Sequence, residues 1–194
     1  MEELKNYKNI ELPDERQKNF SVFDRISGQD RPLSLHDIYQ DVSDIKLHDN
    51  VPEIIRSHFA TAQNLLLYSW FFYPFNVTAE LLAYITVEFA LKERFNTEKK
   101  QSFKCLVKLA IKSGLVKDEG FSHIYVRPEL DGYMKQKVNS ASLETKSYSE
   151  ILIKNIPFLR NELAHGSRTL HPNGVTTVRI CSEFINQLFP EKAN

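Results

Sequence analysis

The stretch of sequence that most constrains the fold runs from Ser147 to Gly166 and reads SYSEILIKNIPFLRNELAHG. Ser147 with Glu150 three residues later forms a capping box, in which each side chain satisfies a backbone N–H of the first helical turn. Gly166 is the residue type that most easily takes the left-handed conformation at a helix end. These signals predict one helix, kinked just before Pro157 because proline lacks the N–H that its turn requires.

The spacing of apolar residues gives this helix two different faces. One apolar stripe suits a protein core and consists of Leu152, Ile156, Leu159 and Leu163. At about 100° per residue, Asn161 and His165 lie together on the opposite side, one turn apart, bordered by Ile151 and Phe158. A plain surface helix would carry Lys and Glu there. A polar pair among apolar residues therefore predicts a second buried surface, such as a dimer interface.

Apolar residues recur at helical spacing along most of the remaining chain. They predict further helices over residues 34–45, 50–73, 76–95, 97–113 and 174–189. The helix over 76–95 has apolar residues around most of its circumference, so we expect it at the centre of the core. Residues 121–128 alternate weakly and fit a short strand or an extended crossover, and residues 131–146 form a polar connection.

The sequence therefore predicts an all-α protein, with an antiparallel helical bundle over residues 49–194 and an N-terminal arm over residues 1–48. We expect the arm to be loose apart from one short helix capped by Ser34 and Asp37, with a loop at residues 27–32. The aromatic run from Tyr68 to Phe75 is expected to lie in the core.

Composition gives weaker limits on function. The formal net charge is zero, which does not support a strongly electrostatic nucleic-acid binder. The charge is uneven, because residues 1–60 carry 8 Lys/Arg against 12 Asp/Glu and residues 61–194 carry 17 against 13. The second part of the chain is therefore mildly basic.

Cysteine usage and hydropathy predict a cytoplasmic protein that does not enter a membrane. Cys105 and Cys181 are far apart, and each falls on the apolar side of a predicted helix, which fits a reducing compartment. The N-terminal residues lack the apolar run of a targeting peptide. The apolar run over residues 65–75 is about half as long as a membrane helix.

The chemistry of the chain is concentrated in the string RNELAHG at residues 160–166. Arg160 offers a planar fork that suits two phosphate oxygens, and His165 can transfer protons near neutral pH. Metal-free RNA cleavage needs a base for the 2′-hydroxyl, an acid for the leaving oxygen and a cation for the phosphorane. One histidine per chain cannot fill both proton-transfer roles, whereas a dimer that brings two copies together would supply both.

RNELAHG at the end of one helix, followed by a loop and a final amphipathic helix, resembles the motif region of the HEPN superfamily. The upstream segment AYITVEFALKERF resembles the inner helix of that family, with Glu88 at a typical position for a polar residue. The resemblance covers roughly residues 50–190 and implies a small all-α bundle that forms homodimers. It also implies a metal-independent endoribonuclease of the kind found in toxin–antitoxin and other defence systems. In that case the catalytic residues are Arg160, Asn161 and His165, and RNA and an antitoxin or other protein are the expected partners.

Other members of this superfamily are inactive binding or scaffold modules, and this alternative stays open. In that case Arg160 and His165 have only structural roles, as a helix-terminal cap and a structural ion pair. The acidic partner in the ion pair is then Glu88 or Glu162. A further alternative is a sensor or adaptor whose acidic arm covers its own basic cleft.

Supporting residues are predicted around the motif. Arg168 and His171 follow it and are candidates for the same cleft. Lysines spaced four residues apart form either a solvated face or contacts to RNA phosphates, namely Lys100, Lys104, Lys108 and Lys112. No set of His, Cys, Asp and Glu has metal-ligand spacing and no glycine loop fits a phosphate, so we expect neither a metal nor a cofactor.

Overall fold

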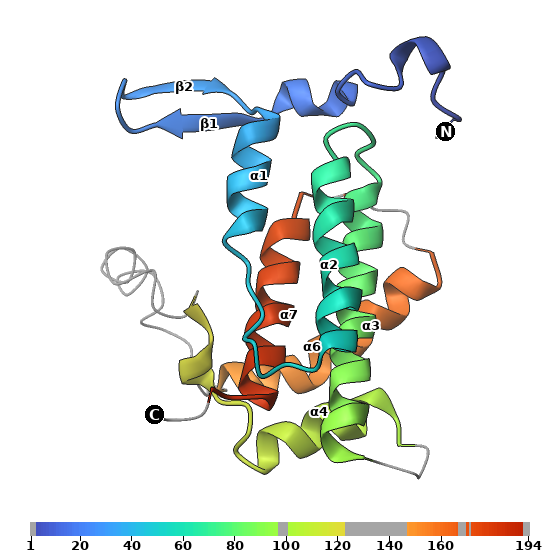
Figure 1. Ribbon diagram of the computed structural model, residues 1–194, viewed down its shortest axis with the longest axis vertical. Coiled ribbons are helices and arrows are strands. Elements are labelled where there is room, and N and C mark those ends of the chain that lie inside the picture. The colour runs from blue at the N-terminus through green and yellow to red at the C-terminus, as the bar shows by residue number, and fades with distance from the viewer. Residues whose placement is uncertain (1–2, 97–100, 123–146, 167–169, 171, 192–194) are drawn as a thin grey trace, which may run out of the picture.

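The chain folds as an all-α bundle with an N-terminal extension, as predicted (Figure 1). The computed structural model describes residues 3–96, 101–122, 147–166, 170 and 172–191. The α-helices in this part of the chain are α1 (Leu35–Ser43), α2 (Glu53–Tyr68), α3 (Phe75–Phe95), α4 (Phe103–Lys112), α6 (Tyr148–Ala164) and α7 (Gly174–Leu188). None of the helices described here combines the length and apolar character needed to cross a bilayer.

Helix α3 is the central element of the bundle, as its apolar circumference predicted. It packs against α2, α7, α6 and α4, and Figure 1 shows α2, α3 and α7 side by side with α4 at one end. Ala79, Ala83, Val87 and Ala90 are fully buried and share one face of α3. Small side chains on that face let the neighbouring helices approach closely.

Helix α7 closes the core with the stripe that its sequence predicted. Val178, Cys181, Ile185 and Leu188 are all fully buried. The helix begins at Gly174, where an added Cβ would lie 2.6 Å from the side chain of Leu66 and collide with it. The start of α7 therefore presses directly on α2.

The two helix starts predicted from a serine cap agree with the structure, and the start predicted at residue 97 does not. Ser34 and Asp37 form the complete capping box of α1. Of the capping box predicted for α6, the structure shows one half, in which the Ser147 hydroxyl accepts a hydrogen bond from the backbone N–H of Glu150. The predicted start of the fourth helix at residue 97 was wrong, because α4 begins at Phe103 and is capped by the Ser102 hydroxyl.

The prediction of a loop at residues 27–32 was also wrong. Strand β1 (Ser21–Asp24) pairs antiparallel with β2 (Gln29–Pro32), and Gly28 has a φ of +68° in the turn. Both strands are short and largely exposed, so they carry no apolar alternation that would identify them from sequence. Arg31 of β2 donates two hydrogen bonds, of 2.7 and 2.6 Å, to Asp37 and so ties the hairpin to α1.

The arm is docked on the bundle, which corrects the expectation that it is loose. It contains two 3-10 helices, η1 (Tyr7–Asn9) and η2 (Glu15–Asn19). Asp14 accepts a hydrogen bond of 2.9 Å from the N–H of Tyr73, and its own N–H donates to the carbonyl of Trp70 at 2.8 Å. The buried side chain of Gln17 donates to the carbonyl of Ser69. These contacts hold the arm across the α2–α3 turn, at one end of the bundle (Figure 1).

The aromatic run over residues 68–75 does not lie wholly in the core, as had been expected. Tyr73 is buried, but Tyr68 is exposed and Phe71, Phe72 and Phe75 are half-buried. The predicted helix over 50–73 ends at Tyr68, and α3 begins at Phe75. The run therefore forms the turn between α2 and α3, where rings point out of the end of the bundle.

Candidate functional site

The helix that carries the motif, α6, is held at its N-terminus by an acidic cap. Asp118, in the 3-10 helix η3 (Asp118–Gly120), accepts hydrogen bonds from the N–H groups of Tyr148 at 2.9 Å and Ser149 at 2.8 Å. Burial alone would raise the pKa of Asp118, but hydrogen bonds from Ser149 and Tyr148 outweigh it and lower the pKa. Two N–H groups that the helix itself cannot satisfy are thus paired.

In the predicted apolar stripe of α6, Leu152 and Ile156 lie in the core and Leu163 packs partly buried against it, so only Leu159 departs from the prediction. Leu152, Ile156 and Pro157 are buried. Leu159 is 41% exposed, although the stripe predicted it inside, and Phe158 beside it is 58% exposed. Helix α6 packs against α3 and α4, and Phe158 and Leu159 are the apolar residues that its C-terminal half presents to solvent.

The motif arginine is held between α6 and α3. Arg160 Nη2 donates a hydrogen bond of 2.9 Å to Glu88 Oε2, and Nη1 donates one of 3.1 Å to Asn161 Oδ1. The other oxygen of Glu88 accepts from Lys92 Nζ at 2.7 Å. The side chains of Glu88 and Arg160 are 14% and 32% exposed. Glu88, rather than Glu162, is therefore the acidic partner of the arginine.

Two of the three predicted catalytic residues touch, and the third lies one turn away. Asn161 accepts from Arg160, and His165 forms the C-cap of α6, with its backbone N–H bonded to the Asn161 carbonyl at 3.0 Å. Asn161, Glu162 and His165 are exposed. Gly166 follows with a φ of +89°, which supports the predicted helix end.

The predicted supporting residues are only partly brought to this site. Lys104, Lys108 and Lys112 are exposed on α4, as a solvated face would be. Lys100, Arg168 and His171 lie outside the described residues, as do most of the predicted strand at 121–128 and the connection at 131–146. The described residues hold no group of three or more His, Cys, Asp and Glu side chains that could bind a metal ion.

Sequence reasoning missed two residues that shape the site. Lys92 follows Glu88 by four residues, a spacing that favours an ion pair on a helix and could have identified it. No local sequence pattern marks Asp118 as a cap of α6, because the two are brought together only when the chain folds.

A second acidic residue of α3 is more deeply buried than Glu88. Glu80 is 3% exposed and accepts a hydrogen bond of 2.9 Å from the Thr177 hydroxyl of α7. Burial and the nearby Glu80 raise the pKa of the Cys181 thiol, so this cluster is suited to joining α3 and α7 rather than to chemistry.

No protein-family model, curated protein or solved structure matches this chain. What the site can do therefore follows from its own geometry. It presents a guanidinium fixed by a carboxylate, an amide beside it and an exposed imidazole within one further turn. Such groups can bind a phosphate and transfer a proton.

Proposed function

We propose that this protein is a metal-independent endoribonuclease of the HEPN type that works as a homodimer in the cytoplasm. The observation that carries this proposal is the grouping of Arg160, Asn161 and His165 at the exposed end of α6, with the arginine held by Glu88. The motif resemblance implies a toxin–antitoxin or other defence system as the setting.

Each residue has a definite role in the proposed reaction. His165 of one copy removes the proton of an RNA 2′-hydroxyl, and the 2′-oxygen then attacks the adjacent phosphorus. The bond from phosphorus to the 5′-oxygen breaks, and His165 of the second copy gives a proton to that oxygen. Arg160 neutralises the charge that develops on the phosphorane, and Asn161 orients Arg160. The products are a 2′,3′-cyclic phosphate and a 5′-hydroxyl.

An exposed apolar surface supports the dimer that this reaction needs. Ile151 and Phe158 of α6, which border the polar pair, are 40% and 58% exposed, and Ile85 of α3 is 38% exposed. Helices α3 and α6 are in contact. Apolar groups beside a polar pair suit an interface in which two His165 side chains face one shared groove.

The proposal is tested by incubating mixed RNA with the purified chain in excess EDTA. We expect cleavage that leaves cyclic phosphate ends, and a loss of about a hundredfold or more in His165→Ala. His36→Ala, at an exposed histidine of α1, is the matched control and is expected to cleave normally. Cleavage that requires a metal, or that is unchanged in His165→Ala, would contradict the proposal.

A second candidate is a catalytically inactive HEPN-like module that forms the same dimer and binds RNA, a nucleotide or a protein. It is favoured by one observation, namely that Arg160 already donates hydrogen bonds to Glu88 and Asn161, so part of its hydrogen-bonding capacity is used within the protein. A folded, dimeric wild type that fails to cleave RNA would support this candidate over the nuclease.

A further inference from the structure

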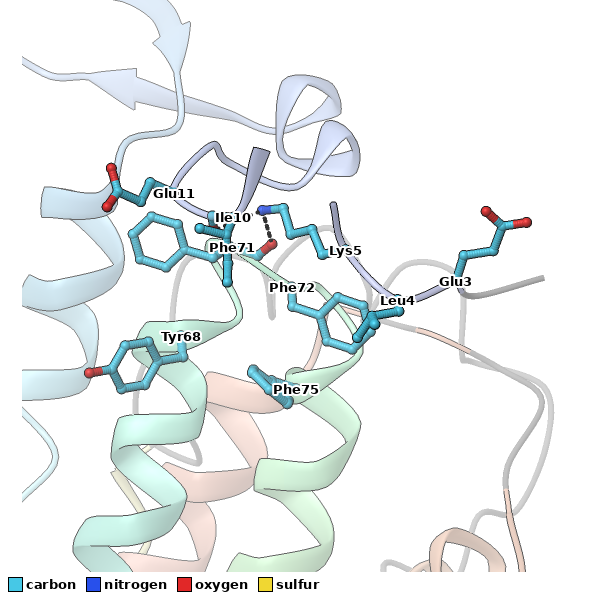
Figure 2. Close-up of a pocket in the computed structure, with 9 residues that line it drawn as sticks. All are labelled: Glu3, Leu4, Lys5, Ile10, Glu11, Tyr68, Phe71, Phe72 and Phe75. Atoms are coloured by element: carbon cyan, nitrogen blue, oxygen red, sulfur yellow. Dashed lines mark hydrogen bonds between the residues drawn. The ribbon is translucent and has the colours of Figure 1, made fainter. Parts of the chain in front are cut away.

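An apolar groove lies between the arm and the α2–α3 turn (Figure 2). Its volume is about 750 Å³. Tyr68, Phe71, Phe72 and Phe75 line it from the bundle, and Leu4 and Ile10 line it from the arm. Phe72 and Phe75 make an edge-to-face contact with ring centroids 5.2 Å apart.

The charged residues at this groove leave an acidic rim. Lys5 donates to the carbonyls of Phe71, at 2.8 Å, and of Ile10 and Leu12. An ammonium group has three N–H donors, so these bonds engage all the donors of Lys5 and hold the arm against the turn. The remaining rim charges are the carboxylates of Glu3 and Glu11, which lie on either side of the rings in Figure 2.

The apolar surface continues well beyond the groove. Leu4 is fully exposed, and Tyr68 and Ile10 are 56% and 52% exposed. Tyr68 and Phe71 also line a second hollow of about 480 Å³, whose other apolar walls are Leu35, Tyr39 and Leu67 of α1 and α2. Adjoining exposed apolar patches of this kind mark protein interaction sites.

We propose that this surface binds a protein partner through an amphipathic helix that carries large apolar residues flanked by Lys and Arg. A small ligand inside the groove would leave Leu4 in water, whereas a helix lying along both hollows would cover it. The acidic rim selects basic flanking residues. It disfavours nucleic acid and anionic membranes, as does the excess of 12 Asp/Glu over 8 Lys/Arg in residues 1–60. This binding site is independent of the nuclease reaction.

The proposal is tested by titrating the full chain with two fluorescent synthetic peptides. Both are amphipathic helices with the same Leu and Phe face, and they differ only in having Lys or Glu on the polar face. We expect the Lys peptide to bind at least about tenfold more tightly than the Glu peptide. Leu4→Ser and Tyr68→Ser are each expected to weaken the Lys peptide about tenfold, because apolar anchors dominate such interfaces. The double variant Glu3→Gln and Glu11→Gln should bind the two peptides with more similar affinities than the wild type does.

Ile26→Ser is the matched control, since Ile26 is 98% exposed but lies in the hairpin turn, outside the groove. The Ile26→Ser variant should bind the Lys peptide with the same affinity as the wild type. The proposal is overturned if the Lys peptide does not bind, if the Glu peptide binds equally well, or if Leu4→Ser and Tyr68→Ser bind like Ile26→Ser. It is also overturned if the surface instead binds anionic vesicles or RNA in competition with the peptide.

Discussion

Arg160 Nη2 lies 2.9 Å from Glu88 Oε2, so the motif helix α6 is joined to the central helix α3 by an ion pair between residues 72 positions apart. The carboxylate fixes where the guanidinium lies. In the proposed nuclease this pair positions Arg160 for a phosphate, and in an inactive module it stabilises the helix packing. Both roles require the same contact, so its energy can be measured apart from any activity.

A double-mutant cycle on Glu88 and Arg160 should give a coupling energy of about 1 kcal/mol, because the pair is mostly shielded from water. Glu88→Ala alone should lower the free energy of unfolding by about 1–2 kcal/mol, since it leaves Arg160 without its acidic partner. The same cycle on Glu88 and Lys92 is the control. Lys92 is half exposed, so we expect no more than about 0.5 kcal/mol there. Denaturant unfolding of the four variants in each cycle measures both values, and equal couplings would contradict the special role of Arg160.

Phe158→Asp should convert the proposed dimer to a monomer. Phe158 is 58% exposed, so a charge there should leave the helix content unchanged while it weakens self-association at least tenfold, or about 1.4 kcal/mol. Light scattering after size-exclusion chromatography measures the mass, and circular dichroism verifies the fold. Ile26→Asp, on the hairpin, should remain dimeric. If the wild type is monomeric at high protein concentration, the proposed homodimer is contradicted.

Docking of the arm should depend on pH through Asp14. Burial alone would raise the pKa of this carboxyl, but the Arg16 side chain and the N–H groups of Tyr73 and Arg16 outweigh it and lower the pKa from 3.8 to about 2. Arg16 belongs to the arm itself, so docking accounts for the part of this lowering that comes from Tyr73, and the released arm binds the proton more readily to that extent. Docking is therefore strongest above about pH 4 and weakens by about 1 kcal/mol as the pH falls from 4 to 2.

This dependence can be measured by hydrogen exchange of the Asp14 N–H, which is bonded to the Trp70 carbonyl. Protection should fall between pH 4 and 2 in the wild type, after correction for intrinsic exchange. In Asp14→Asn it should be low at every pH. Asp24→Asn, at the end of strand β1, is the control and should keep the wild-type profile. Protection of Asp14→Asn equal to that of the wild type at pH 6 would show that the carboxylate does not hold the arm.

The two cysteines should react at very different rates. The sequence predicted both on apolar helix faces, but Cys105 is exposed on α4 and only Cys181 is buried. Burial raises the pKa of the Cys181 thiol and also excludes reagents. A maleimide should therefore label one thiol quickly in the native protein and the second only after unfolding. Cys105→Ser should lose the fast label, and fast labelling of that variant would contradict the buried position of Cys181.

Features that depend on neighbours in sequence were predicted well. The capping box of Ser34 and Asp37, the stripe of α7 from Val178 to Leu188 and the end of α6 at Gly166 all arise from contacts within a few residues. The pairing of Glu88 with Arg160 was one of two alternatives, and the local sequence could not choose between Glu88 and Glu162. The hairpin at residues 21–32 and the exposure of Leu159 were predicted incorrectly, because their patterns resemble a loop and a core stripe.

The sequence by itself determined the helices and most of their buried faces, because helical periodicity and caps act over one or two turns. Only the tertiary structure decided that Asp118 caps α6, that Glu88 rather than Glu162 holds Arg160, and that the arm docks through Asp14 on the α2–α3 turn. It also decided that the rings of Tyr68, Phe71, Phe72 and Phe75 line an open groove. These contacts join residues that are from 30 to 72 positions apart, and such residues meet only once the helices have packed.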